Sequence, residues 1–322
     1  MARILLENGA LLRPQGRYKY KRAGALHYAA KQGHPVIIRD ILDKFGHGLM
    51  DDAVFDDEQR WTTSLSCGIK SGNPAAVEAL IRGAHGSELN HYHTAEPVLH
   101  LAIAENQGAI VDVLLNNKAV DINFNHSETV DSPPLVCAVR LRNEPIFEKI
   151  LNAAKVDADS PDAQSRTALW WAAALGLDSY VEKLLASRKL YHLDRHDNKG
   201  DTALSIAVRL GHLGVVRQLL RVHQASTIGL EPIIFAAKNG HTPVVEELLP
   251  YKVTDKKAAE QLLQRYGLQQ VWLDIENSKA WEEVKDEEKS TESDYDGKIS
   301  ESEPSYASEV ISAPFNVFKP GW

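Results

Sequence analysis

The sequence predicts an all-α fold of about seven helical hairpins that stack on one another and are connected by short β-hairpins or loops. The clearest unit is Asp201–Leu220, in which two apolar-periodic stretches, Ser205–Leu210 and Leu213–Leu220, flank Gly211. Thr202 is placed to cap the first helix, and glycine readily adopts the left-handed conformation that ends it. Both helices are shorter than the roughly 12–15 residues that an isolated helix needs in water, so the hairpin must stack on similar hairpins.

The same pattern recurs along the chain. Each copy begins with a leucine or isoleucine, has small residues three and four positions later and a turn residue at the seventh, and continues with paired apolar residues. These anchor residues are Leu26, Leu65, Leu99, Leu135, Leu169, Leu204 and Ile233, and they lie 29–39 residues apart. Repeats of this length with two helices each predict a solenoid, whose core grows one repeat at a time.

Prolines support the positions of the second helices. Pro35, Pro74, Pro145 and Pro243 each follow the position equivalent to His212 by one or two residues. Proline is favoured in the first turn of a helix, where its missing N–H costs nothing. After the first repeat, residues 46–57 form an insertion rich in Gly and Asp, which is expected to be a loop.

The repeats resemble those of the ankyrin family over about Met1–Pro250. The best match lies in 197–220, at Asp197, Gly200, Thr202, Leu204, Ala207, Gly211, His212, Leu219 and Leu220. Shorter fragments are Leu26-His27-Tyr28-Ala29-Ala30, Leu99-His100-Leu101-Ala102 and Gly240-His241. The opening proline remains only at Pro134 and Pro232, and Asn106 and Arg142 replace the turn glycine. The resemblance implies an ankyrin-repeat domain over 23–250 that binds protein partners.

Both ends of the array are expected to carry terminal elements. Residues 1–12 contain Ile4–Ala10, which matches only the second helix and turn of a repeat. This segment is interpreted either as a partial repeat of a longer array or as an N-terminal cap. Residues 255–275 contain an amphipathic helix, expected to be a C-terminal cap, with a partner-binding helix as the alternative.

The C-terminal segment 276–322 is predicted to be disordered. Residues 276–310 contain 12 acidic and 4 basic residues, and the resulting balance equals the net charge of −8 of the whole chain. A segment so polar buries too little apolar surface to offset its conformational entropy. Thr291, Ser293 and Ser300 each have an acidic residue three positions later and are candidate phosphorylation sites. The apolar end, 313–322, is interpreted as a linear motif or as a segment that folds back.

Composition predicts a soluble intracellular protein of the cytoplasm or nucleus. The chain of 322 residues is 43% hydrophobic and has no apolar run of membrane-spanning length and no secretory signal. Cys67 and Cys137 both follow an anchor leucine by two positions and are expected to face the core, too far apart for a disulfide. Trp171 is expected in the core, whereas Trp170 could pack on the preceding repeat or lie exposed.

No motif indicates an enzyme, a cofactor or a metal. The sequence lacks a phosphate-binding glycine loop, a nucleophile elbow and paired Cys-x-x-Cys motifs. His91, His93 and His100 lack companion ligands, and the family uses the His100 position for a hydrogen bond between repeats. The basic run Arg13–Arg22 is too short to indicate nucleic-acid binding. We therefore expect a monomer with protein partners and no small-molecule substrate or membrane.

The resemblance implies that partners contact the hairpin tips and the ends of the first helices. Those positions are Gln59, Arg60, Thr62, Lys70, His93, Glu96, Glu105, Arg140, Gln164, Arg166, Asn198, Lys199, Asp201 and Arg209. Their mixed charges favour a folded protein or peptide over a polyanion. The double substitution of Arg166 and Lys199 is expected to weaken binding without unfolding the array.

Three functions remain open from the sequence. The first is a non-catalytic scaffold or adaptor that binds partners in the concave groove. The second is a regulatory protein whose acidic, phosphorylatable tail controls binding by occupying the groove or a partner's basic surface. The third is a targeting or sensor fragment of a larger multidomain protein, which the partial repeat at Met1 favours.

Overall fold

The computed structural model describes residues 24–45, 54–55, 61–82, 97–125, 132–222 and 230–248, together with Leu89 and scattered positions between 260 and 273. These residues fall into two compact units, which meet in sequence between Ala163 and Gln164. Several predictions lie outside the described residues: the N-terminal segment 1–12, the basic run and the acidic tail. Most of the predicted capping helix also lies outside them and stays a prediction.

Each unit consists of helical hairpins, which confirms the all-α repeat fold. The helices of the first unit are α2 (Ala25–Lys31), α3 (Pro35–Phe45), α4 (Ser64–Lys70), α5 (Pro74–Ile81), α7 (Val98–Ala104), α8 (Gly108–Leu115), α9 (Pro134–Arg140) and α10 (Glu144–Asn152). Those of the second unit are α11 (Ala168–Ala174), α12 (Asp178–Ala186), α13 (Ala203–Leu210), α14 (Leu213–Val222), α15 (Leu230–Lys238) and α16 (Thr242–Leu248). Each predicted anchor residue lies in the first helix of a pair.

Local sequence signals set the helix boundaries. Thr202 and Ser205 form a reciprocal capping box at the start of α13, and Gly211 ends this helix at φ 78°. The four prolines expected in second helices all occupy the first or second residue of one. β1 (Val54–Phe55), near the end of the insertion, pairs antiparallel with β2 (Trp61–Thr62) just after it, so this connection contains a two-stranded β-hairpin.

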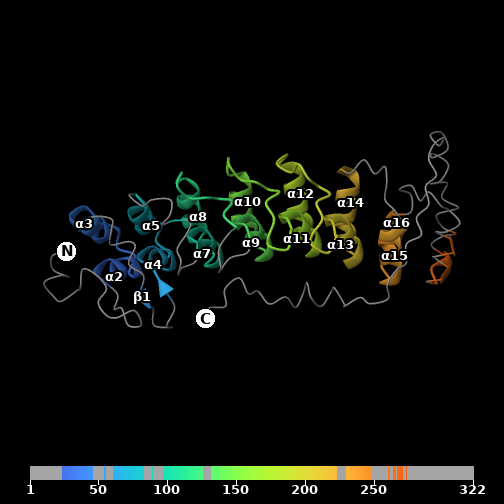
Figure 1. Ribbon diagram of the computed structural model, residues 1–322, viewed down its shortest axis with the longest axis horizontal. Coiled ribbons are helices and arrows are strands. Elements are labelled where there is room, and N and C mark those ends of the chain that lie inside the picture. The colour runs from blue at the N-terminus through green and yellow to red at the C-terminus, as the bar shows by residue number, and fades with distance from the viewer. Residues whose placement is uncertain are drawn as a thin grey trace. The chain divides into compact units, whose positions relative to one another are not determined.

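Within each unit, first helices pack on first helices and second helices on second helices (Figure 1). In the first unit α2, α4, α7 and α9 form one layer and α3, α5, α8 and α10 the other. In the second unit the layers are α11, α13, α15 and α12, α14, α16. The anchors Leu26, Leu99 and Leu169 are buried in the core, as are Trp170 and Trp171. Burying one face of each helix against the next repeat compensates for its short length.

Polar side chains at the start of the second helices connect consecutive turns. In the second unit His212 Nε2 lies 3.1 Å from the Ala174 carbonyl oxygen, and His241 Nε2 lies 3.0 Å from that of Arg209. In the first unit the Asn73 side chain donates to the Gly33 carbonyl at 2.7 Å. These bonds satisfy carbonyl groups at or just after the ends of first helices, where the helix itself supplies no partner.

The histidines pack so closely on the preceding turn that glycine is required there. A Cβ atom at Gly211 would lie 2.6 Å from His241 Nδ1, whereas one at Gly240, which has a similar positive φ of 72°, would meet none of the described residues within 4 Å. Gly240→Ala is therefore expected to lower the free energy of unfolding by about 1 kcal/mol through backbone strain alone. Gly211→Ala is expected to cost about 2 kcal/mol, because His241 must also move. Urea unfolding of both variants measures the difference, and equal losses would contradict the packing argument.

The turns that lack glycine keep the same left-handed geometry. Asn106 and Arg142 have φ values of 56° and 53°, and Arg142 is exposed. Arg142→Gly is expected to stabilise the protein by about 0.5–1 kcal/mol, because relief of the backbone strain exceeds the added entropy of the unfolded chain. The measurement is the urea midpoint, with Arg82→Gly at an exposed helix end as the control that is expected to destabilise.

Candidate protein-binding surface

In the first unit, three of the predicted contact residues end neighbouring first helices. Lys70 is the last residue of α4, Glu105 caps the C-terminus of α7, and Arg140 is the last residue of α9. The three helices pack in that order. Lys70 and Glu105 are exposed, and Arg140 is half-buried with its guanidinium donating to Ser132 Oγ at 3.1 Å. The result is a row of polar side chains of both signs along one edge of the layer.

In the second unit, two hairpin tips are bonded side by side. The Asn198 backbone N–H donates to the Gln164 carbonyl at 3.0 Å, and Ser165 Oγ donates to Asn198 Oδ1 at 2.7 Å. Gln164, Asn198 and Lys199 are exposed. Their backbones are held by hydrogen bonds, so little ordering of the backbone would accompany binding at these tips.

A buried carboxylate organises the second of these tips. The Asp197 side chain is 1% exposed, and its Oδ1 accepts the backbone N–H groups of Lys199 at 2.9 Å and Asp201 at 2.8 Å. Its Oδ2 lies 3.6 Å from Arg166 Nε. The guanidinium of Arg166 lies over the rings of Trp170 and Trp171, 4.7 and 5.4 Å from the two ring centres. Arg166 therefore joins the preceding tip to the aromatic core.

A second ion pair joins Asp201 and Arg209 in the following repeat. Arg209 Nη2 donates to Asp201 Oδ1 at 2.7 Å, and the Asp201 side chain is 6% exposed. The Arg209 guanidinium also lies 4.7 Å from the ring centre of Phe235 in α15. Asp201 thus neutralises a cation that bridges α13 and α15.

These contacts correct part of the predicted surface. Thr62 and Asp201 are buried, so their side chains support the fold and are not accessible to a partner. Arg166 and Arg209 are half-buried and engaged with the core, so the double substitution of Arg166 and Lys199 is expected to lower stability as well as binding. Gln59, Arg60, His93 and Glu96 lie outside the described residues, as do Thr291, Ser293 and Ser300.

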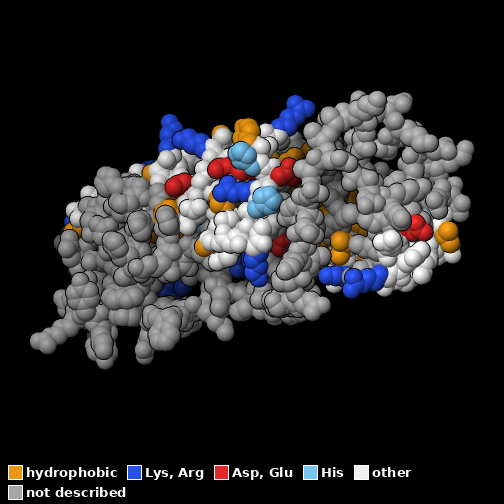
Figure 2. Space-filling view, turned by 45° about the vertical axis from the view of Figure 1, so that its right-hand side comes forward, with side chains coloured by type: hydrophobic (Ala, Val, Ile, Leu, Met, Phe, Trp, Pro, Cys, Tyr) orange, Lys and Arg blue, Asp and Glu red, His pale blue; other side chains and the backbone are white. Residues whose placement is uncertain are grey.

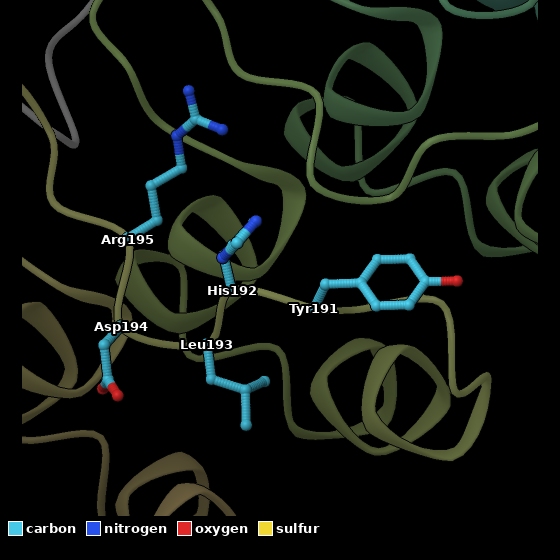
Figure 3. A pocket seen from close by; sticks show the side chains of 5 residues that line it. All are labelled: Tyr191, His192, Leu193, Asp194 and Arg195. Atoms are coloured by element: carbon cyan, nitrogen blue, oxygen red, sulfur yellow. The ribbon is translucent and has the colours of Figure 1, made fainter.

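The sequence predicted no role for the loop that precedes the tip at Asn198 and Lys199. Tyr191 is 80% exposed. Together with His192, Leu193, Asp194 and Arg195 it lines an open pocket (Figure 3). These residues match no position of the repeat pattern, and an aromatic residue in such a loop was the one signal available in the sequence.

His100 and the two cysteines make contacts that support the fold. His100 Nε2 lies 2.9 Å from the Ser132 carbonyl oxygen of the next repeat, which confirms the predicted hydrogen bond between repeats. Cys137 is buried and its Sγ donates to the Ser132 carbonyl at 3.7 Å, whereas Cys67 is half-buried with its Sγ 3.6 Å from Thr62 Oγ1. Among the described residues, no group of three or more His, Cys, Asp or Glu side chains is placed to hold a metal ion. No described helix is long and apolar enough to cross a membrane.

Comparison with family models decides the family. The model for ankyrin repeats matches three overlapping stretches, residues 26–126, 99–195 and 135–228, which together cover more than half of the chain. The chain belongs to the ankyrin-repeat family. The hairpin tips and first-helix ends described above are therefore ankyrin tips and ankyrin first helices.

Related proteins share these ankyrin repeats over part of their length. The chain is 31% identical over 109 residues to neurogenic locus notch homolog protein 1 of Xenopus tropicalis, covering 34% of this chain and 4% of that protein. It is 28% identical over 200 residues to the TRP cation channel subfamily A member 1 homolog of Caenorhabditis elegans, covering 62% of this chain and 15% of that protein. The chain thus spans a small fraction of the length of these relatives.

A solved ankyrin structure shows the same fold. The ankyrin repeat domain of Bcl-3 superposes with a TM-score of 0.58 at 22% identity, covering 70% of this chain and 98% of that domain. At this identity the likeness establishes the architecture, an all-α ankyrin solenoid, and not the partner.

Proposed function

We propose that this protein is a non-catalytic scaffold or adaptor of the cytoplasm or nucleus that binds a protein partner through its ankyrin tips and first-helix ends. The observation that carries the proposal is the exposure of polar side chains at these positions in each unit, Lys70 and Glu105 in the first and Gln164, Asn198 and Lys199 in the second. Ankyrin repeats in general mediate protein–protein interaction, and the backbone under these side chains is held by hydrogen bonds.

The charges favour a folded protein or a peptide as the partner. Figure 2 shows basic, acidic and histidine side chains interspersed among the described residues of the visible face, without a broad area of one sign. A nucleic acid would require a continuous basic face. A mixed surface instead fits a partner whose charges alternate in a complementary way.

The test compares two charge reversals within the second unit. Affinity capture from native lysate uses the full chain, a Lys199→Glu variant at the tip, and an Arg221→Glu variant at an exposed position near the end of the second helix α14. A partner of the proposed surface is lost with Lys199→Glu and retained with Arg221→Glu. Equal retention of the partner by both variants would show that the partner does not bind at the tips. Circular dichroism checks that both variants are folded.

A further inference from the structure

The loop between α12 and α13, residues 188–199, carries an unusual concentration of basic and aromatic side chains. It contains Arg188, Lys189, Arg195 and Lys199, two histidines, and Tyr191, against two acidic residues. Arg188, Arg195 and Lys199 are exposed. Tyr191 is the most exposed large hydrophobic residue of the described chain, at 80%. We call these residues the α12–α13 loop.

Basic side chains outnumber acidic ones in the loop by four to two, and one of the two acidic side chains is engaged with a cation outside the loop. Asp197 is buried beside Arg166 and accepts backbone N–H groups, so its charge is compensated internally. In Figure 3 the Arg195 and His192 side chains extend in the same direction, away from the Asp194 carboxylate. The loop therefore presents cations and an aromatic ring together, the combination that aromatic and arginine hot spots of interfaces use.

Hydrogen bonds hold the C-terminal part of this loop. His196 Nδ1 lies 2.9 Å from the Gly200 carbonyl oxygen, and the Asp197 backbone N–H donates to the Asp201 carbonyl at 2.9 Å. The neighbouring tip is bonded to Gln164. A backbone held by hydrogen bonds lowers the entropy cost of docking a segment on this part of the loop.

A segment of complementary charge exists in the same chain. Residues 282–303, which we call the acidic segment, contain most of the acidic residues that set the net charge of −8. About 35 residues separate it from Leu248 at the end of α16. A chain of that length spans roughly 50 Å even when wholly helical. The second helices α12, α14 and α16 pack in succession, and two such spacings amount to roughly 20 Å. The acidic segment can therefore reach the loop.

We propose that the α12–α13 loop is the docking site of the chain's own acidic segment. Covalent connection gives the segment a high effective concentration at the loop, so modest charge attraction suffices for docking. Phosphates at Ser293 or Ser300 add charge and oxygen acceptors that match arginine, so they strengthen the contact. The loop adjoins Asn198 and Lys199, and a docked segment therefore competes with a partner at that tip. This regulatory consequence rests on the proposed function, whereas the contact within the chain does not.

Zero-length carbodiimide cross-linking of the full chain tests the contact. The reagent joins a lysine to a carboxylate only where the two touch, and mass spectrometry identifies the pair. The expected product in the monomer fraction links Lys189 or Lys199 to a carboxylate of residues 282–303. Reversal of Arg188 and Arg195 to glutamate keeps both lysines and is expected to lower the yield about tenfold. High salt is expected to lower the yield of this cross-link as well.

A charge-matched control makes the result specific. Arg82→Glu with Arg221→Glu changes the net charge by the same amount at exposed positions outside the loop, and it is expected to leave the cross-link unchanged. Tail cross-links of equal yield at lysines elsewhere on the repeats, or a yield unaffected by the Arg188 and Arg195 reversal, would overturn the proposal. The cross-link reports the contact within the chain only. Failure of partner capture, which tests the proposed function, is therefore distinguishable from failure here.

Discussion

Lowering the pH from 7.5 to 4 is expected to reduce the free energy of unfolding by about 3 kcal/mol more in the wild-type protein than in a His100→Gln variant. His100 is buried, and its Nε2 lies 2.9 Å from the Ser132 carbonyl oxygen. Burial lowers the pKa of His100 from 6.5 to about 4, and the hydrogen bond to Ser132 opposes this only in part. Glutamine keeps a donor for that carbonyl and does not titrate.

The sign follows from the two pKa values. The pKa in the folded state lies below that in the unfolded state, so folding favours the neutral ring. The stabilisation by neutral His100 is fully present above about pH 6.5 and is lost as the pH falls toward 4, where the unfolded chain binds a proton more readily. Urea unfolding at a series of pH values measures this loss. His192→Gln, at an exposed loop position, is the control and should follow the wild-type curve. Parallel curves for wild type and His100→Gln would refute the assignment.

Arg166→Ala is expected to lower the free energy of unfolding by about 2–3 kcal/mol. The Arg166 side chain is 17% exposed and approaches the Asp197 carboxylate, which is 1% exposed. Its guanidinium also covers Trp170 and Trp171. Truncation removes the stacking and leaves a buried carboxylate without its neighbouring cation, and this unpaired charge is the larger part of the cost.

Lys199→Ala is the matched control for this prediction. Lys199 lies on the adjoining tip but is exposed, so its truncation is expected to change the free energy of unfolding by less than about 0.5 kcal/mol. Urea unfolding compares the two variants. A loss for Arg166→Ala as small as that for Lys199→Ala would show that Arg166 is an ordinary surface residue. For the same reason a binding experiment should substitute Lys199 alone and not the Arg166 and Lys199 pair.

The accessible part of the surface could be predicted only incompletely from the sequence. Lys70 and Lys199 occupy expected contact positions and are exposed, but Thr62 and Asp201 occupy equally expected positions and are buried. All four are polar residues of the hairpin tips and first-helix ends, to which the family resemblance assigns partner contacts, and only the structure separates the exposed pair from the buried pair. Tyr191 was missed because the repeat pattern has no signature residue in that part of the connection between α12 and α13.

The sequence by itself determined the hairpins, because the signals that start and end each helix are local. Thr202, Gly211 and the prolines act within one turn of the helix that they bound, and the anchor leucines recur at the repeat period. Only the tertiary structure decided which polar side chains remain accessible. Arg166 meets Asp197, and Arg209 meets Phe235, across neighbouring repeats. Such partners lie about one repeat away in the chain, and stacking alone brings them together.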